Sequence, residues 1–320
     1  MRARNVGGFV ALLAVLALLA PGRAAGQGET AGMITELKPG RGRVEVRPAG
    51  ASAWTAARPL QALRAGDAVR ASADAVAVVL LTAGRGTVRV DAAGSPLTLA
   101  APAAGEGRGQ KARALVQAGV GFLAGATRES GQAMLSTRGV ARPPVVLSPR
   151  NGPVLPDALV FEWNGSRFAR YTVRVLAPGG RVVAERAGVT GASWSYPADA
   201  PRLQAGARYT FQVAGAVQAP QEAWFEVLDA ARAQAIRADL AALEQELGAT
   251  APPNSLAVMR AGVLAQAGLL HDARLAVAAA LARDPDEAAL HLLLAGLLGR
   301  MGLPEQAAEA RDEAEFLLSR

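Results

Sequence analysis

The last third of the chain repeats a pattern of small and apolar residues after 34 positions. The recurring residues are Leu264, Gly268, Leu269, Ala273 and Ala280, followed by Leu298, Gly302, Leu303, Ala307 and Ala314. A period of this length is typical of stacked helical hairpins, each of which buries its apolar face against the next. The recurrence therefore predicts two helical hairpins, at about 254–287 and 288–320.

The period and the small residues resemble those of tetratricopeptide repeats, and Pro285 ends the first unit where that family's pattern does. The family's aromatic residues are replaced, because Leu264 and Leu298 occupy Tyr positions while Ala257 and His291 occupy Trp positions. About three repeats are normally needed for a stable array. We therefore expect a further helix or a partner to complete this one.

A further helix is predicted just before the repeats. Its apolar residues recur at intervals of three and four: Ile236, Leu240, Leu243 and Leu247. This spacing forms one apolar stripe along a helix, which Ala251-Pro-Pro253 ends. Residues 229–320 are therefore expected to form a C-terminal region of tetratricopeptide-like helical hairpins.

Strand patterns with a period of two fill residues 141–228. Six runs follow one another at regular spacing: 159–163, 171–175, 181–184, 193–196, 209–213 and 223–227. Tyr171, Val173 and Val175 share one face, and Pro178-Gly-Gly180 predicts a hairpin turn. Most aromatic residues of the chain lie in this stretch, which favours a two-sheet sandwich with an aromatic core.

The motif Leu203-x-x-Gly206-x-x-Tyr209-x-Phe211-x-Val213 resembles the late-strand signature of fibronectin type III and related immunoglobulin-like domains. The resemblance implies an immunoglobulin-like β-sandwich at 141–228 with no catalytic role. It also implies that the Tyr209 hydroxyl bonds back to the preceding corner of the chain.

Short strands are also predicted in residues 27–140, where Val44 and Val46 alternate with charged residues. Gly66-Asp67 predicts a tight turn, because glycine accepts a positive φ and the Asp carboxylate accepts from nearby backbone N–H groups. Residues 101–140 are expected to hold a mobile basic loop and an apolar strand around Gly119-Val-Gly121. A phosphate-binding loop is not expected, since Lys111 is followed by Ala112 rather than Ser or Thr.

The motif Leu63-x-x-Gly66-Asp67-x-Val69-Arg70 resembles FecR-like domains, together with Trp54 before it and the apolar run 78–81 after it. Ala83-Gly84 departs from the Asp-Gly usual in that family. The resemblance implies a non-enzymatic, periplasmic β domain at 27–140.

The N-terminus has the three parts of a secretory signal peptide. Basic residues in Met1-Arg-Ala-Arg4 precede an apolar run at 10–20, and Ala24-Ala-Gly26 supplies small residues before a cleavage site at Gln27. We therefore expect residues 1–26 to be removed and the protein to be periplasmic or secreted, with no transmembrane helix after cleavage. An uncleaved N-terminal anchor is the alternative.

The sequence contains no recognisable catalytic or metal-binding motif. The sequence contains no cysteine, which excludes disulfides, thiolate metal sites and a cysteine nucleophile. Its two histidines, His271 and His291, have no metal-ligand spacing, and no hydrolase or nucleotide fingerprint occurs. We expect no enzyme, cofactor, metal or nucleic-acid partner, with a hydrolase built from dispersed carboxylates as the alternative.

Function is expected to lie in the repeats. The repeat resemblance implies a groove lined by the first helix of each unit, at Val258, Gln266, Leu292 and Arg300. Gly262 and Gly296 would leave room for bulky side chains of an envelope protein partner. The helix at 229–247 or a second copy of the chain are the other expected occupants.

The predicted role is therefore an exported, non-catalytic interaction or scaffold protein of the cell envelope. Two other roles stay open. One is an envelope signalling regulator, by analogy with FecR. The other is a glycan- or peptidoglycan-binding module, which an exposed Trp54 or Trp194 would favour.

Overall fold

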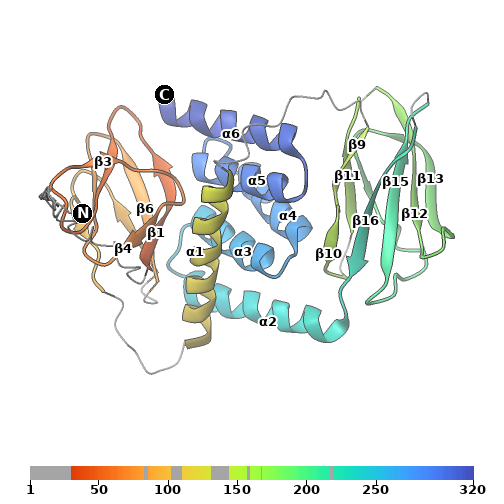
Figure 1. Cartoon of the computed structure of the whole chain (residues 1–320), viewed down its shortest axis with the longest axis horizontal. Coiled ribbons are helices and arrows are strands. Elements are labelled where there is room, and N and C mark those ends of the chain that lie inside the picture. Colours follow the sequence, from red (N-terminus) through yellow and green to blue (C-terminus); the bar gives the residue numbers. More distant parts are fainter. Residues whose placement is uncertain are drawn as a thin grey trace, which may run out of the picture.

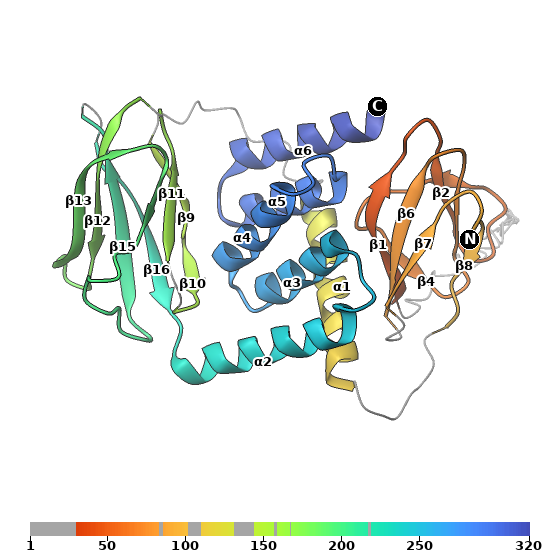
Figure 2. The same cartoon turned by 180° about the vertical axis from the view of Figure 1, so that it is seen from behind.

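The structure is a computed structural model that describes residues 30–82, 86–101, 110–130, 144–156, 159–166, 168–216 and 219–320. Two β units lie at opposite ends of the molecule, and a group of helices separates them (Figures 1 and 2). The expected class, β structure followed by a C-terminal helical region, is confirmed at this level. The predicted leader at 1–26 lies outside the described residues, and so do residues 102–109 and 131–140 of the segment in which the basic loop was predicted.

The first β unit, residues 30–101, consists of two four-stranded sheets with the orders β4-β1-β6-β7 and β3-β2-β5-β8. Alternate residues of both sheets form one aliphatic core that includes Ile34, Val46 and Val79. The strands are β1 (Thr30–Lys38), β2 (Val44–Arg47), β3 (Thr55–Ala56), β4 (Ala62–Arg64), β5 (Ala68–Ala71), β6 (Val76–Leu81), β7 (Thr87–Val90) and β8 (Leu97–Thr98).

The turn predicted at Gly66-Asp67 is present between β4 and β5. Gly66 has a φ of 84°, which is unfavourable for residues with a Cβ. The Asp67 carboxylate accepts from the backbone N–H groups of Arg64 at 2.8 Å and Ala49 at 2.9 Å. Asp67 thus fixes both its own turn and the neighbouring loop.

The second β unit, residues 144–228, is a sandwich of a five-stranded sheet, β10-β16-β15-β12-β13, and a three-stranded sheet, β14-β11-β9. Its core contains stacked aromatic rings, with the Phe161 and Phe211 centroids 4.3 Å apart. The strands are β9 (Val145–Ser148), β10 (Gly152–Val154), β11 (Val160–Asn164), β12 (Arg170–Leu176), β13 (Val182–Thr190), β14 (Ser193–Ser195), β15 (Arg208–Ala214) and β16 (Gln221–Val227).

Two local predictions for this unit are confirmed. Gly179 and Gly180, both with a φ of 83°, form the turn between β12 and β13. The buried Tyr209 side chain turns back to the preceding corner, where its hydroxyl oxygen accepts from the Gln204 N–H at 2.8 Å.

The C-terminal region forms the predicted helices. Asp229 caps the first of them by accepting from the Arg232 N–H at 2.8 Å. The next four form two antiparallel hairpins, and Gly268 and Gly302 adopt positive φ between the helices of each pair. The helices are α2 (Ala230–Leu247), α3 (Pro253–Gln266), α4 (Leu270–Leu281), α5 (Ala288–Arg300) and α6 (Pro304–Ser319).

The prediction of a strand around Gly119-Val-Gly121 is wrong, because these residues lie inside a helix, α1 (Gln110–Ser130). This helix follows the first β unit in sequence but packs against α2, α3 and α5. Its buried side chains join a large apolar cluster that is formed mainly by the C-terminal helices. We call α1–α6 together the helical hub.

Candidate functional site

The face that the repeats were expected to offer to a partner is covered by α1. This helix packs across α3 and α5, the first helices of the two hairpins (Figure 1). At the crossing, a Cβ added to Gly119 of α1 would lie 2.9 Å from Met259 Cε, and one added to Gly262 of α3 would lie 3.2 Å from Leu123 Cδ1. Gly262 therefore does make room for a bulky side chain, and that side chain is Leu123 of the same chain.

The four predicted lining residues differ in how far they are buried. Val258 is fully buried, and Leu292 is half-buried against the same apolar cluster. Gln266 and Arg300 are exposed, and the Arg300 guanidinium lies 4.5 Å from the centre of the Phe122 ring of α1. Within the chain, the helix that covers this face is thus α1, whereas the helix at 229–247 was one of the expected occupants.

A helical signal for α1 was present in the sequence. Its buried residues Ala112, Val116, Val120 and Leu123 recur at intervals of four, four and three, which is the apolar stripe of a helix. The glycine-rich composition around this stripe favoured a loop and a strand and concealed it.

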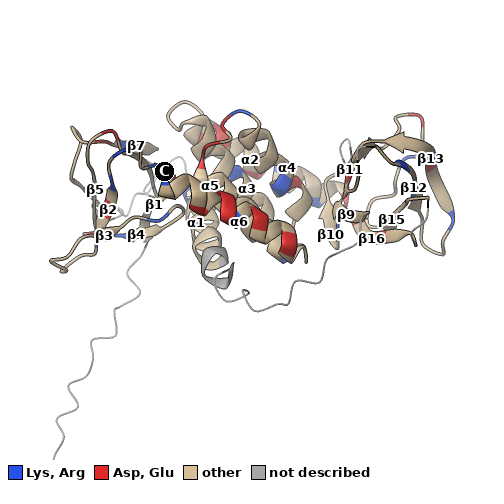
Figure 3. Cartoon of the chain, turned by 90° about the horizontal axis from the view of Figure 1, so that it is seen from above, with Lys and Arg blue, Asp and Glu red and all other residues tan. Residues whose placement is uncertain are grey.

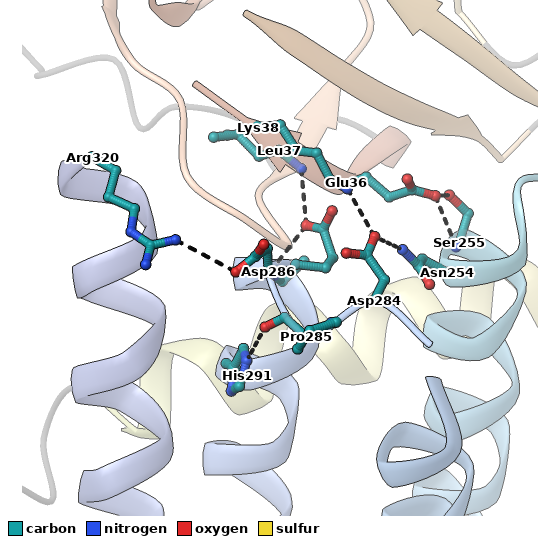
Figure 4. A network of polar contacts seen from close by, with 12 residues as sticks. Glu36, Leu37, Lys38, Asn254, Ser255, Asp284, Pro285, Asp286, His291 and Arg320 are labelled. Atoms are coloured by element: carbon teal, nitrogen blue, oxygen red, sulfur yellow. Dashed lines mark hydrogen bonds and ion pairs between the residues drawn. The ribbon is translucent and has the colours of Figure 1, made fainter. Parts of the chain in front are cut away.

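Two junctions join the hub to the β units. At the first junction, polar groups of β1 meet the N-terminal ends of α3 and α5 (Figure 4). Glu36 accepts from both the Ser255 hydroxyl, at 2.6 Å, and the Ser255 N–H, at 3.1 Å. Lys38 pairs with Asp284, just before α5, at 2.8 Å. Met33 and Leu80 of the first β unit extend the apolar cluster of the hub.

Glu287 is the buried centre of this first junction. Its Oε1 accepts from the Leu37 N–H of β1 at 3.1 Å and from the Ala289 N–H at 3.3 Å, so it caps α5 and holds the strand at once. Among the described residues, its Oε2 has no hydrogen-bond partner. Burial, reinforced by the nearby Glu36 carboxylate, raises the pKa of Glu287 to about 7.

The second junction joins the hub to β9–β11 through different groups. The buried Ser148 hydroxyl contacts Nδ1 of His271, and Glu162 forms an ion pair with the buried Arg274. Leu147 packs against the α5–α6 hairpin. Burial lowers the pKa of His271 to about 4, so its ring is neutral at physiological pH.

Both histidines make contacts within the fold. His271 belongs to the second junction, and Nε2 of the half-buried His291 lies 2.7 Å from the Pro285 carbonyl oxygen. Within the described ranges, no group of three or more His, Asp or Glu side chains is arranged to hold a metal ion.

Charged side chains near the first junction are paired with one another. A cleft between the first β unit and the end of α6 contains Arg41, paired with Asp74 at 3.4 Å, and Arg320, paired with Asp286 at 3.5 Å. On the wider surface, acidic side chains gather along α6, whereas Lys and Arg are scattered over both β units (Figure 3).

The two tryptophans that would favour glycan binding are both half-buried. Trp194 stacks on Phe161 of the sandwich core with the ring centres 5.6 Å apart. Trp54 lies beneath the guanidinium groups of Arg47 and Arg70, at 4.8 and 4.3 Å from its ring centre. Both indoles are therefore engaged by residues of the chain itself.

Comparison of the chain with protein-family models finds no match, and comparison with curated proteins finds none either. Among the helices that the structure describes, none has both the length and the apolar composition of a membrane span.

Proposed function

We propose that this chain is a non-catalytic, exported scaffold protein of the cell envelope that binds a protein partner through its helical hub. The observation that carries the proposal is the groove along α3 and α5, which already holds an amphipathic helix. A helix laid into an apolar groove is a common mode of protein recognition. The junctions at both ends would hold the β units beside such a partner.

The proposed domain identities follow the sequence resemblances. The two-sheet arrangement of the second β unit and the Tyr209–Gln204 bond support an immunoglobulin-like or fibronectin type III-like sandwich. The Gly66-Asp67 turn supports a FecR-like first unit, and the α3–α4 and α5–α6 hairpins support tetratricopeptide-like repeats. Export to the periplasm or beyond rests on the sequence of residues 1–26.

Site-specific photo-crosslinking tests partner binding and its place together. A photoreactive amino acid replaces Gln266, which is exposed at the end of α3, and in a control it replaces Arg186, which is exposed on β13. In cells, the proposal predicts a covalent adduct with another protein from position 266 and none from position 186. Adducts from position 186 alone, or from neither position, would contradict it. Cell fractionation of the same strain checks export.

A further inference from the structure

The helix in the groove has glycines that its packing does not require. Gly119 lies in close contact, because an added Cβ would lie 2.9 Å from Cε of the fully buried Met259 and would force that side chain to shift. At Gly121 and Gly125, in contrast, an added Cβ would meet no atom within 4 Å. Glycine inside a helix lowers the helix equilibrium by about fivefold per position relative to alanine. Two of the three glycines therefore weaken α1 without improving its contacts.

The start of α1 is unfavourable as well. Its first turn contains no acidic residue, and Lys111 and Arg113 place positive charge at the positive end of the helix dipole. The Nε atom of Arg113 is buried and has no hydrogen-bond partner in the described part of the chain. Lys111 forms an exposed ion pair with Asp239 of α2 at 2.6 Å, and such pairs contribute little.

What holds α1 in place is its apolar stripe. Val116, Val120 and Leu123 are buried in the cluster with Met259 and the rest of α3. This contact is made by side chains of one face, and any helix with the same pattern of small and aliphatic residues would fit it. The groove therefore selects helices with this spacing of small and aliphatic residues. The helix that now fills it, α1, has a low intrinsic helix stability.

We infer that α1 is an internal occupant of the groove that a partner's amphipathic helix displaces. The inference rests on the proposed function, which it makes more specific. The partner helix has a small residue facing Met259 and Gly262, and aliphatic residues at the positions equivalent to Val116, Val120 and Leu123. In the absence of a partner, α1 keeps this apolar surface covered.

A peptide of known sequence tests the displacement directly. The probe is a fluorescent peptide of residues 110–130 carrying Gly121→Ala and Gly125→Ala, which strengthen its helix. We expect saturable binding to the full chain. The same peptide with Gly119→Leu is expected not to bind, because the leucine would collide with Met259.

Stabilising the internal helix provides the critical comparison. A full chain carrying Gly121→Ala and Gly125→Ala should bind the probe about 25-fold more weakly, since about fivefold is expected at each position. Gly299→Ala is the matched control, because Gly299 lies in α5 and a Cβ added there would also meet no atom within 4 Å. This variant should bind the probe like the wild type.

Absence of saturable binding to the wild-type chain, or equal affinity for the wild type and the double variant, would overturn the inference. Photo-crosslinking at position 266 separates this failure from failure of the proposed function. An adduct formed there without probe binding would mean that a partner binds the hub while α1 stays in place.

Discussion

At its junction with the first β unit the hub buries a carboxyl group, whereas at its junction with the second it buries an imidazole. Glu287 and His271 occupy equivalent roles, since each connects a helix N-terminus of the hub to a β unit. Burial disfavours the charged form of both, and these charges have opposite signs. The two junctions of one molecule therefore respond to pH in opposite directions.

The direction of each response follows from proton uptake. Glu287 has a folded pKa of about 7 against an ordinary 4.5, so the folded chain holds more protons and loses stability as the pH rises between these values. His271 has a folded pKa of about 4 against an ordinary 6.5, so the unfolded chain holds more protons and stability is lost as the pH falls from 6.5 toward 4. Between about pH 4.5 and 6.5 the two effects oppose each other.

The largest effect is expected from breaking the ion pair of the second junction. Glu162→Gln leaves the buried Arg274 guanidinium without its carboxylate and should lower the free energy of unfolding by about 3 kcal/mol. Urea denaturation at pH 6 measures this change. Glu185→Gln, which removes the exposed partner of Arg174 at 3.1 Å, is the control and should cost less than about 0.5 kcal/mol. Equal effects of the two substitutions would mean that the second junction does not form.

Without the Glu287 carboxyl of the first junction, the pH dependence of stability should be that of His271 in the second junction. Glu287→Gln keeps an acceptor for the Leu37 N–H but no longer titrates. Its unfolding free energy should rise with pH by about 1.4 kcal/mol per unit between about pH 4.5 and 6.5, because only the effect of His271 remains. The wild type and the exposed control Glu309→Gln should stay nearly flat over this interval. A flat profile for Glu287→Gln would contradict the account.

The opposite slope should appear when the imidazole is removed. His271→Asn keeps a polar group near Ser148, and the unfolding free energy of this variant should fall by about 1.4 kcal/mol per pH unit over the same interval, because Glu287 then acts alone. His291→Gln controls for the loss of an imidazole and should follow the wild type. A variant slope with the same sign as that of Glu287→Gln would reject the assignment of opposite responses.

The smallest effect concerns the interior of a β unit rather than a junction. Tyr209→Phe removes the acceptor of the Gln204 N–H bond at 2.8 Å and should cost about 1 kcal/mol. The loss should be the same at pH 5 and pH 6.5, which separates it from the junction variants. Chemical denaturation at the two pH values is the measurement, and an unchanged midpoint would show that the bond contributes nothing.

Much of the fold could be predicted because local patterns dominate it. The alternation of Tyr171, Val173 and Val175 identified β12, and the 34-residue recurrence identified the helical hairpins. The pairing of Gly66 with Asp67 identified a turn that the structure contains. In each of these cases the residues that carry the signal also make the local contacts.

The content of the groove and the two junctions could not be predicted in the same way. Glu287 contacts Leu37 across 250 positions, and a contact over this separation leaves no local pattern in the sequence. His271 similarly meets Ser148 across 123 positions. For α1, the three glycines favoured a loop and a strand in the prediction and concealed the apolar stripe. In the fold, the packing of this stripe against the hub stabilises the helix despite these glycines.

The helical hub holds both β units in one arrangement through the junctions at Glu287 and His271. Small-angle X-ray scattering of the purified chain at pH 5.5 tests this arrangement most directly, because both Glu287 and His271 are then expected to be neutral. We expect the scattering profile of one elongated body with the hub between its ends, as in Figure 1. A profile that requires β units moving independently of the hub would contradict it.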